Sequence, residues 1–125
     1  MFYNISNHPS SKWSEGQLAA AKQLGGEIRD IAFPNVPPTA TFDDVTSLAL
    51  ATLKQLPGNS GDVYMVQGEF SLTYTMTSLL GFLKARVVVA CSDRKVVERQ
   101  LEDGKTSKEA VFEFVQFRDV LKHAS

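Results

Sequence analysis

The sequence is poor in the features that define several large protein classes. It has one cysteine, Cys91, among 125 residues, which argues against a scaffold held by disulfides within the chain. Its longest unbroken apolar run, residues 87–91, is far shorter than the roughly 20 residues of a membrane-spanning helix. The first residues lack the charged and apolar regions of a signal peptide. These absences predict a cytoplasmic protein without a membrane segment.

The chain also lacks an excess of charge of either sign. The chain has 13 basic and 14 acidic residues and a net charge of -1, which argues against binding of duplex nucleic acid. A small anionic ligand remains open, because a pocket needs only a few local donors. The glycine-rich and P-loop motifs of common nucleotide sites are missing. No spacing of His, Cys and carboxylates resembles a metal site, so we expect neither a metal nor a cofactor.

What is present indicates one globular domain over residues 1–125. Hydrophobic residues make up 43% and charged residues 22%, both ordinary for a soluble protein. Short apolar runs predict strands at residues 2–6, 27–33, 63–66, 87–91 and 112–117. Ser14 and Gln17 have the form of a capping box for a helix that Gly25-Gly26 ends, and Thr41 and Asp44 suit the start of a second helix that ends at Pro57.

Two segments are less clear. Residues 70–83 fit a third helix through a stripe of large apolar residues, although the alternation over 70–76 also fits a strand. We favour the helix, because its stripe is longer and lies between two strand-like runs. Residues 92–102 suggest a short helix or loop, and the C-terminal residues a short helix or tail.

This order of elements predicts an α/β, Rossmann-like domain. Its sheet would be largely parallel and five-stranded, with helices on both faces. Ligands of such folds bind beyond the carboxyl ends of the strands, near the point where the strand order reverses. The expected site therefore draws on three loops, at residues 6–13, 67–71 and 92–94.

The first loop is the richest in chemistry. It combines hydroxyls, an amide, an imidazole, a cation and an indole beside a helix N-terminus, where backbone amides favour an anion. A lone histidine there can also act as an acid or base near neutral pH. The alternative is a polar loop with a buried tryptophan anchor and a capping serine. The candidate ligand-binding residues are Ser6, Asn7, His8, Ser10, Ser11, Lys12 and Trp13.

The other two loops add four candidates. Gln67 can recognise a base edge, Gly68 allows close approach of the backbone, and Glu69 can accept from a ribose hydroxyl or an adenine amine. Arg94 can hold a phosphate with two hydrogen bonds. The structural alternatives are a helix start favoured by Glu69 and a helix capped by Ser92 or Asp93. Phe112, Phe114 and Phe117 fit a core strand or a dimer contact better than a ligand platform.

The chain also resembles a known group of proteins. The segment Asn4-Ile5-Ser6-Asn7-His8-Pro9-Ser10, followed by Trp13-Ser14 and Gln17, is similar to that of small CRISPR-associated proteins of type III systems, as are Gly68-Glu69-Phe70 and the ending from Phe112 to Arg118. These are similar to the CARF and ring-nuclease group. The resemblance implies a CARF-like homodimer that binds cyclic oligoadenylate, chiefly cyclic tetra-adenylate. It carries over Ser6, Asn7, His8, Ser10, Ser11, Gly68 and Glu69 as ligand-binding residues.

Three functions follow as hypotheses. The first is attenuation of type III CRISPR antiviral signalling by sequestration of cyclic tetra-adenylate, with a higher assembly on ligand binding as a further expectation. The second is metal-independent cleavage of the ring, in which a ribose 2′-hydroxyl attacks the adjacent phosphorus and His8 and Lys12 act as catalytic residues. The Asp-x-Thr-His-Gly motif of some larger relatives is missing, which favours binding over cleavage. The third is an unrelated small-metabolite binder or assembly protein.

Overall fold

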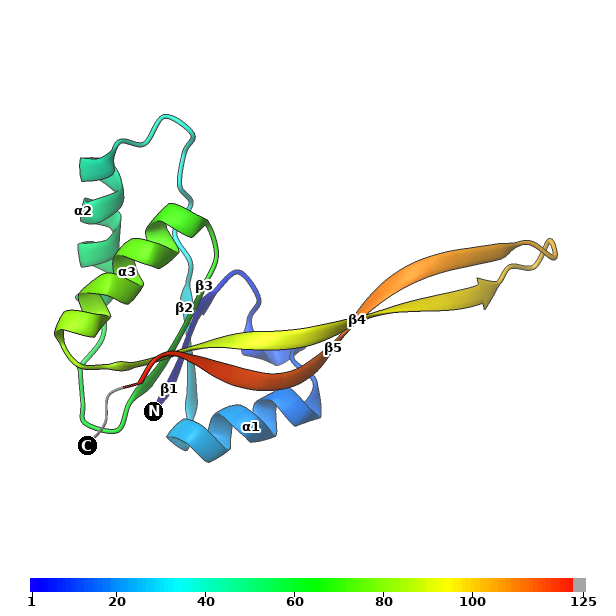
Figure 1. Cartoon of the computed structure of the whole chain (residues 1–125), viewed down its shortest axis with the longest axis horizontal. Helices are drawn as coiled ribbons and strands as arrows, with labels where there is room; N and C mark the ends of the chain where they lie inside the picture. Colours follow the sequence, from blue (N-terminus) through cyan, green and yellow to red (C-terminus); the bar gives the residue numbers. More distant parts are fainter. Residues whose placement is uncertain (123–125) are drawn as a thin grey trace.

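A five-stranded sheet with the strand order β2-β1-β3-β4-β5 forms the centre of the molecule (Figure 1). The computed structural model describes residues 1–122. Strands β1 to β4 are parallel and β5 runs antiparallel to β4. The elements, in chain order, are β1 (Phe2–Ser6), a 3-10 turn η1 (Ser10–Lys12), α1 (Glu15–Gly25), β2 (Ile28–Ala32), α2 (Phe42–Leu53), β3 (Val63–Gln67), α3 (Phe70–Phe82), β4 (Arg86–Gln100) and β5 (Thr106–Leu121). The predicted α/β fold with a largely parallel sheet is confirmed.

Helices cover both faces of the sheet, as the sequence predicted. Helix α1 lies on one face, and α2 and α3 lie together on the other (Figure 1). Alternate residues of β1 divide between the two cores, since successive strand residues point to opposite faces. Phe2 packs with Ala21 on the α1 face, and Tyr3 packs with Leu72 on the α2 and α3 face.

The helix ends follow the capping residues of the sequence. The Ser14 hydroxyl accepts a hydrogen bond from the Gln17 amide at 3.2 Å and caps α1. Thr41 and Asp44 form a reciprocal capping box at α2. Residues 70–82 form a helix, because the stripe of Leu72, Met76 and Leu80 is buried against the sheet.

The largest difference from the sequence prediction is the β4–β5 hairpin. Residues 92–102 were expected to form a short helix or loop, yet β4 continues through Gln100 and pairs with a β5 that runs from Thr106 to Leu121. The run 87–91 was expected to be buried on both faces, but only Val87 and Val88 are fully buried. Residues 92–100 are mostly polar and give little strand signal, although Asp103-Gly104 between the two strands is typical of a hairpin turn. The expected C-terminal helix or tail is a strand up to Leu121, and His123 lies outside the described residues.

The hairpin extends well beyond the rest of the sheet (Figure 1). Pairing of β4 with β3 ends at Met65 and Val88, whereas pairing with β5 continues to Gln100 and Thr106. A register shift between Cys91 and Ser92 marks the point where the hairpin leaves the sheet. We call residues 92–114, beyond this point, the arm. Within residues 1–122, no helix is both long and apolar enough to cross a membrane.

Candidate functional site

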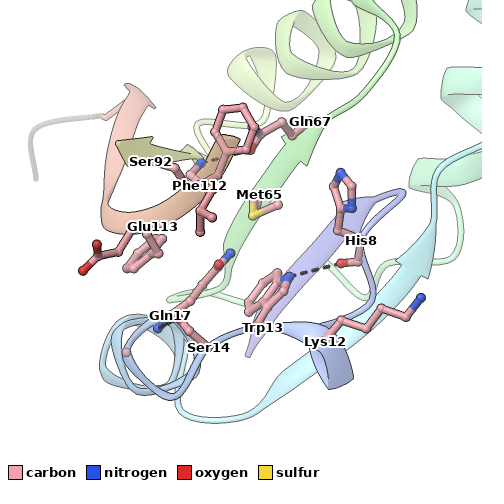
Figure 2. Close-up of a pocket in the computed structure, with 14 residues that line it drawn as sticks. His8, Lys12, Trp13, Ser14, Gln17, Met65, Gln67, Ser92, Phe112 and Glu113 are labelled. Carbon is pink, nitrogen blue, oxygen red and sulfur yellow. Dashed lines mark hydrogen bonds between the residues drawn. The ribbon is translucent and has the colours of Figure 1, made fainter. Parts of the chain in front are cut away.

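The strand order itself indicates where a ligand would bind. In the order 2-1-3-4-5, the switch point lies between β1 and β3, where one following helix covers one face and the next covers the other. A cavity of about 1060 Å³ lies beside this point, between the start of α1, the end of β3 and the base of the arm (Figure 2). Its walls are formed by His8, Lys12, Trp13, Ser14, Gly16, Gln17, Met65, Gln67, Ala90, Ser92, Val111, Phe112, Glu113 and Phe114.

A buried asparagine shapes the loop between β1 and α1. Asn4 is 1% exposed, and its Nδ2 donates to the His8 carbonyl and to Asp30 Oδ1, both at 2.9 Å. Its Oδ1 accepts from the Ser6 hydroxyl at 2.6 Å, and the Ser6 oxygen accepts from the His8 amide at 3.1 Å. These bonds fold the chain back immediately after β1. The His8 backbone is therefore fixed while its side chain is free to face the cavity.

Asp30 on β2 holds the next part of the same loop. Its carboxylate accepts from the Ser10 amide at 3.2 Å and from the Ser10 hydroxyl at 3.0 Å. It also accepts from Asn4, so one carboxylate ties β1, β2 and η1 together. Ser6 and Ser10, both predicted to bind ligand, thus engage partners inside the protein.

Trp13 is anchored rather than free to move. Its indole N–H donates to the His8 carbonyl at 3.1 Å (Figure 2). Its ring lies edge-on to Phe2 and tilted to Phe117, with centroids 6.1 Å away in each case. The half-buried indole forms a fixed wall of the cavity.

The remaining candidates of the first loop lie at different distances from the cavity. His8 and Lys12 line it, and in Figure 2 the Lys12 side chain extends along the rim, away from Met65. Asn7 and Ser11 are exposed and do not line it.

The loop after β3 contributes one side chain to the cavity. Gln67 lines it, and its Oε1 accepts from the Ala90 amide at 3.0 Å, which links β4 to β3 beyond the end of their ladder. The Nε2 group of Gln67 keeps its donors. Gly68 does approach a neighbour closely, but this neighbour is the ring of Phe33, which a Cβ at this position would meet at 2.7 Å.

Glu69 caps α3. Its carboxylate accepts from the amides of Ser71 and Leu72 at 2.8 Å and 3.0 Å and from the Ser71 hydroxyl at 2.7 Å. The hydroxyl bond, followed by the two amide bonds, lowers the pKa of Glu69. The carboxylate has the structural role that the sequence left open, and it does not line the cavity.

Arg94 lies on the arm rather than in a loop. The expected loop at residues 92–94, with its alternative of a helix cap, is wrong because these residues are inside β4. Arg94 pairs in register with Phe112 and does not line the cavity. Ser92, two residues earlier on the same side of β4, does line the cavity.

The part of the cavity wall that the hairpin provides was not predicted from the sequence. Phe112, Phe114 and Glu113 reach the cavity only because β5 folds back along β4, and nothing local to these residues indicates this. Gln17 was assigned a capping role, yet its side chain extends from α1 toward Met65 (Figure 2). The polar type of Gln17, in the first turn of the helix after β1, was the available sequence signal for a position at the cavity.

Charge at the cavity is balanced and local. Glu113 pairs with Lys95 at 2.6 Å, and this hydrogen bond raises the pKa of Lys95. The first turn of α1 adds the partial positive charge of a helix N-terminus, with Gly16 in the cavity wall. The cavity thus combines amide and imidazole groups with aromatic walls, a set of groups that can bind a heteroaromatic ring.

Comparisons with other proteins establish kinship but no activity. Neither the curated proteins nor the solved structures contain a significant match to this chain. Residues 1–118 match the family described as the Uncharacterized protein MJ1673 family, and the chain belongs to this family.

Proposed function

We propose that the chain binds cyclic oligoadenylate, with cyclic tetra-adenylate as the expected ring, and lowers its free concentration by sequestration in a homodimer. The observation that carries the proposal is the composition of the cavity at the switch point. There, amide side chains, an imidazole and aromatic rings surround about 1060 Å³. This volume is at the upper end of small-molecule sites, as a cyclic oligonucleotide requires.

Groups suited to an adenine lie on opposite walls of the cavity. Gln17 and Gln67 carry amides that both donate and accept, and adenine presents a donor and acceptors on its edges. Trp13 carries a flat face, and base stacking on such a face contributes about 1–3 kcal/mol.

Phosphate would be bound near α1. The first helical turn leaves amides without acceptors inside the helix, and Gly16 in that turn lines the cavity. Lys12 adds a cation at the rim. A cyclic ligand with repeated phosphates and a two-fold dimer share symmetry, so each donor would be used twice. This supports a local anion site in a chain whose net charge is -1.

The arrangement favours sequestration over cleavage. His8 is the one histidine within residues 1–122, and it lines the cavity, where an imidazole can donate a proton to the leaving 5′-oxygen. Glu113, the one carboxylate among the residues that line the cavity, is ion-paired with Lys95. In-line attack by a 2′-hydroxyl would thus lack a free base of the protein, and we expect turnover to be slow or absent.

Calorimetric titration with cyclic tetra-adenylate tests the proposal. We expect saturable binding of cyclic tetra-adenylate, with a higher affinity than that of linear tetra-adenylate. We also expect to recover the intact ring after incubation with the protein, with or without EDTA. Gln17→Ala should weaken binding at least fivefold, whereas Gln23→Ala, an exposed glutamine of the same helix, should leave the affinity unchanged. Absence of binding at micromolar protein would refute the proposal, and multiple turnovers to linear di-adenylate would replace sequestration by ring cleavage.

A further inference from the structure

The arm lacks a supporting layer in the single chain. Within residues 1–122, β4 and β5 pair with no third strand beyond Val88, apart from the bond between Gln67 and the Ala90 amide. Figure 1 shows the two strands extending away from all three helices. A free two-stranded ribbon is at best marginally stable in water. The arm therefore has both faces available for a partner.

The two faces of the arm differ in chemistry. Val88 and Ala90 pack on the α1 side of the sheet, and strand alternation continues this side along the arm. We call it the pocket face, because it begins at the cavity. It carries Ser92, Arg94, Val96, Glu98, Lys108, Ala110, Phe112 and Phe114. The opposite side, the outer face, carries Asp93, Lys95, Val97, Arg99, Ser107, Glu109, Val111 and Glu113, of which Val111 and Glu113 also border the cavity at the base of the arm.

Exposure and ion pairing separate the faces further. Val96 and Phe112 on the pocket face are 59% and 69% exposed, whereas Val97 and Val111 on the outer face are 40% and 39% exposed. The outer face holds two ion pairs, Lys95–Glu113 at 2.6 Å and Arg99–Glu109 at 3.0 Å. Long paired side chains cover the outer face as on ordinary solvent-exposed strands. The pocket face is the one whose apolar residues still require burial.

We infer that the pocket face of the arm binds the pocket face of a second copy, with the two-fold axis running along the arms. This rotation places β4 of one copy opposite β5 of the other. Each residue then meets the partner's copy of its own cross-strand neighbour. Glu98 is in register with Lys108, so it faces Lys108 of the partner subunit. Val96 likewise faces the partner's Ala110.

The same rotation is also favourable for the pair Arg94 and Phe112 on the pocket face, whereas the equivalent packing of the outer face would be unfavourable. Arg94 is in register with Phe112, so its guanidinium meets the ring of the partner's Phe112, a favourable cation–π contact. On the outer face, Asp93 is in register with Glu113, and the equivalent packing would oppose two carboxylates. Charge complementarity therefore selects the pocket face.

The contact area predicts how strong this dimer is. Residues 92–100 at about 3.3 Å per residue, over a ribbon about 10 Å wide, offer roughly 300 Å² per copy. The two arms together bury roughly 600 Å², less than the ~1,200 Å² of a stable interface. We expect a reversible dimer. Its two cavities open toward the same axis, and a ligand that contacts both would tighten it; this last expectation alone rests on the proposed function.

Sedimentation velocity over a range of protein concentrations tests the inference without any ligand. Val96→Lys should raise the dimer dissociation constant at least tenfold, because the two-fold axis doubles each buried charge. Val97→Lys is the matched control: it changes the neighbouring valine on the outer face and should alter the constant less than twofold. A monomer at all concentrations, or loss of the dimer in Val97→Lys instead, would overturn the inference.

A charge exchange gives an independent readout. Glu98→Lys and Lys108→Glu should each weaken the dimer, and the double variant should restore it, because opposite charges again face each other. Failure of the double variant to restore association would contradict the assigned packing. A dimer with this pattern that ignores cyclic tetra-adenylate would refute only the proposed function. Tight ligand binding by a strict monomer would refute the arm contact and the homodimer of the proposed function, but it would leave the binding of cyclic tetra-adenylate intact.

Discussion

Replacing Asn4 by Ala tests whether the buried network after β1 builds the candidate site. Asn4 makes three side-chain hydrogen bonds, to the His8 carbonyl, Asp30 and Ser6, at 2.9, 2.9 and 2.6 Å. Net contributions of about 1 kcal/mol for a neutral bond and about 1.5–3 kcal/mol for one to a carboxylate suggest a loss of about 4 kcal/mol. An unfolding entropy of about 2.1 cal/mol/K per residue converts this loss to a melting temperature lowered by roughly 15 °C.

Urea unfolding followed by circular dichroism would measure the loss, with Asn7→Ala as the control. Asn7 is exposed, so its variant should change the unfolding free energy by less than about 0.5 kcal/mol. Asn4→Asp keeps the shape of Asn4 but presents an oxygen to Asp30 and to the His8 carbonyl. The loss of unfolding free energy in Asn4→Asp should become smaller on acidification, because the protonated carboxyl group can again donate a hydrogen bond. A loss below about 1 kcal/mol in Asn4→Ala would refute the structural role of the network.

Three further predictions concern stability. Burial, followed by the charge of Asp62, raises the pKa of Tyr64 to about 12, so the stability that depends on its protonated form is intact below pH 10 and is lost as the pH rises through 12. About 2 kcal/mol of the unfolding free energy should be lost between pH 9 and pH 11.5, as measured by urea titrations against Tyr64→Phe, whose curve should stay flatter. Gly68→Ala should cost about 1–3 kcal/mol through the clash with the Phe33 ring, and unchanged thermal stability would contradict the 2.7 Å approach. Thr41→Ala should cost about 1 kcal/mol through loss of the α2 cap, whereas Thr41→Ser should retain most of it in the same melting experiment.

Local patterns were sufficient for most of the sheet and the helices. The strand at 2–6 and the starts of α1 and α2 were predicted because apolar runs and capping residues act within a few positions of themselves. The helix at 70–82 was predicted correctly over its strand alternative, since three of its apolar residues lie on one buried stripe. The hairpin was not predicted, because the mostly polar residues 92–100 lack a clear apolar alternation; the Asp103-Gly104 turn between Gln100 and Thr106 was the available signal.

The candidate site divides in the same way. The location at the carboxyl ends of the strands, and with it His8, Lys12, Trp13 and Gln67, followed from the order of elements. The inward roles of Ser6 and Ser10 did not, because they depend on Asn4 and on Asp30 from another strand. A hydroxyl in a loop looks the same in a sequence whether it faces a ligand or a buried amide.

Local sequence patterns were enough to predict an α/β fold of balanced charge, with a polar loop and a helix start after its first strand. That a 15-residue β4 and a 16-residue β5 extend together beyond the sheet as an arm is visible only in the folded chain. The tertiary structure also decided that the base of this arm closes the cavity with Phe112 and Phe114. The physical reason is that short-range propensities act within one segment. Strand pairing, burial of a ring and the face of an arm depend on which distant segments meet.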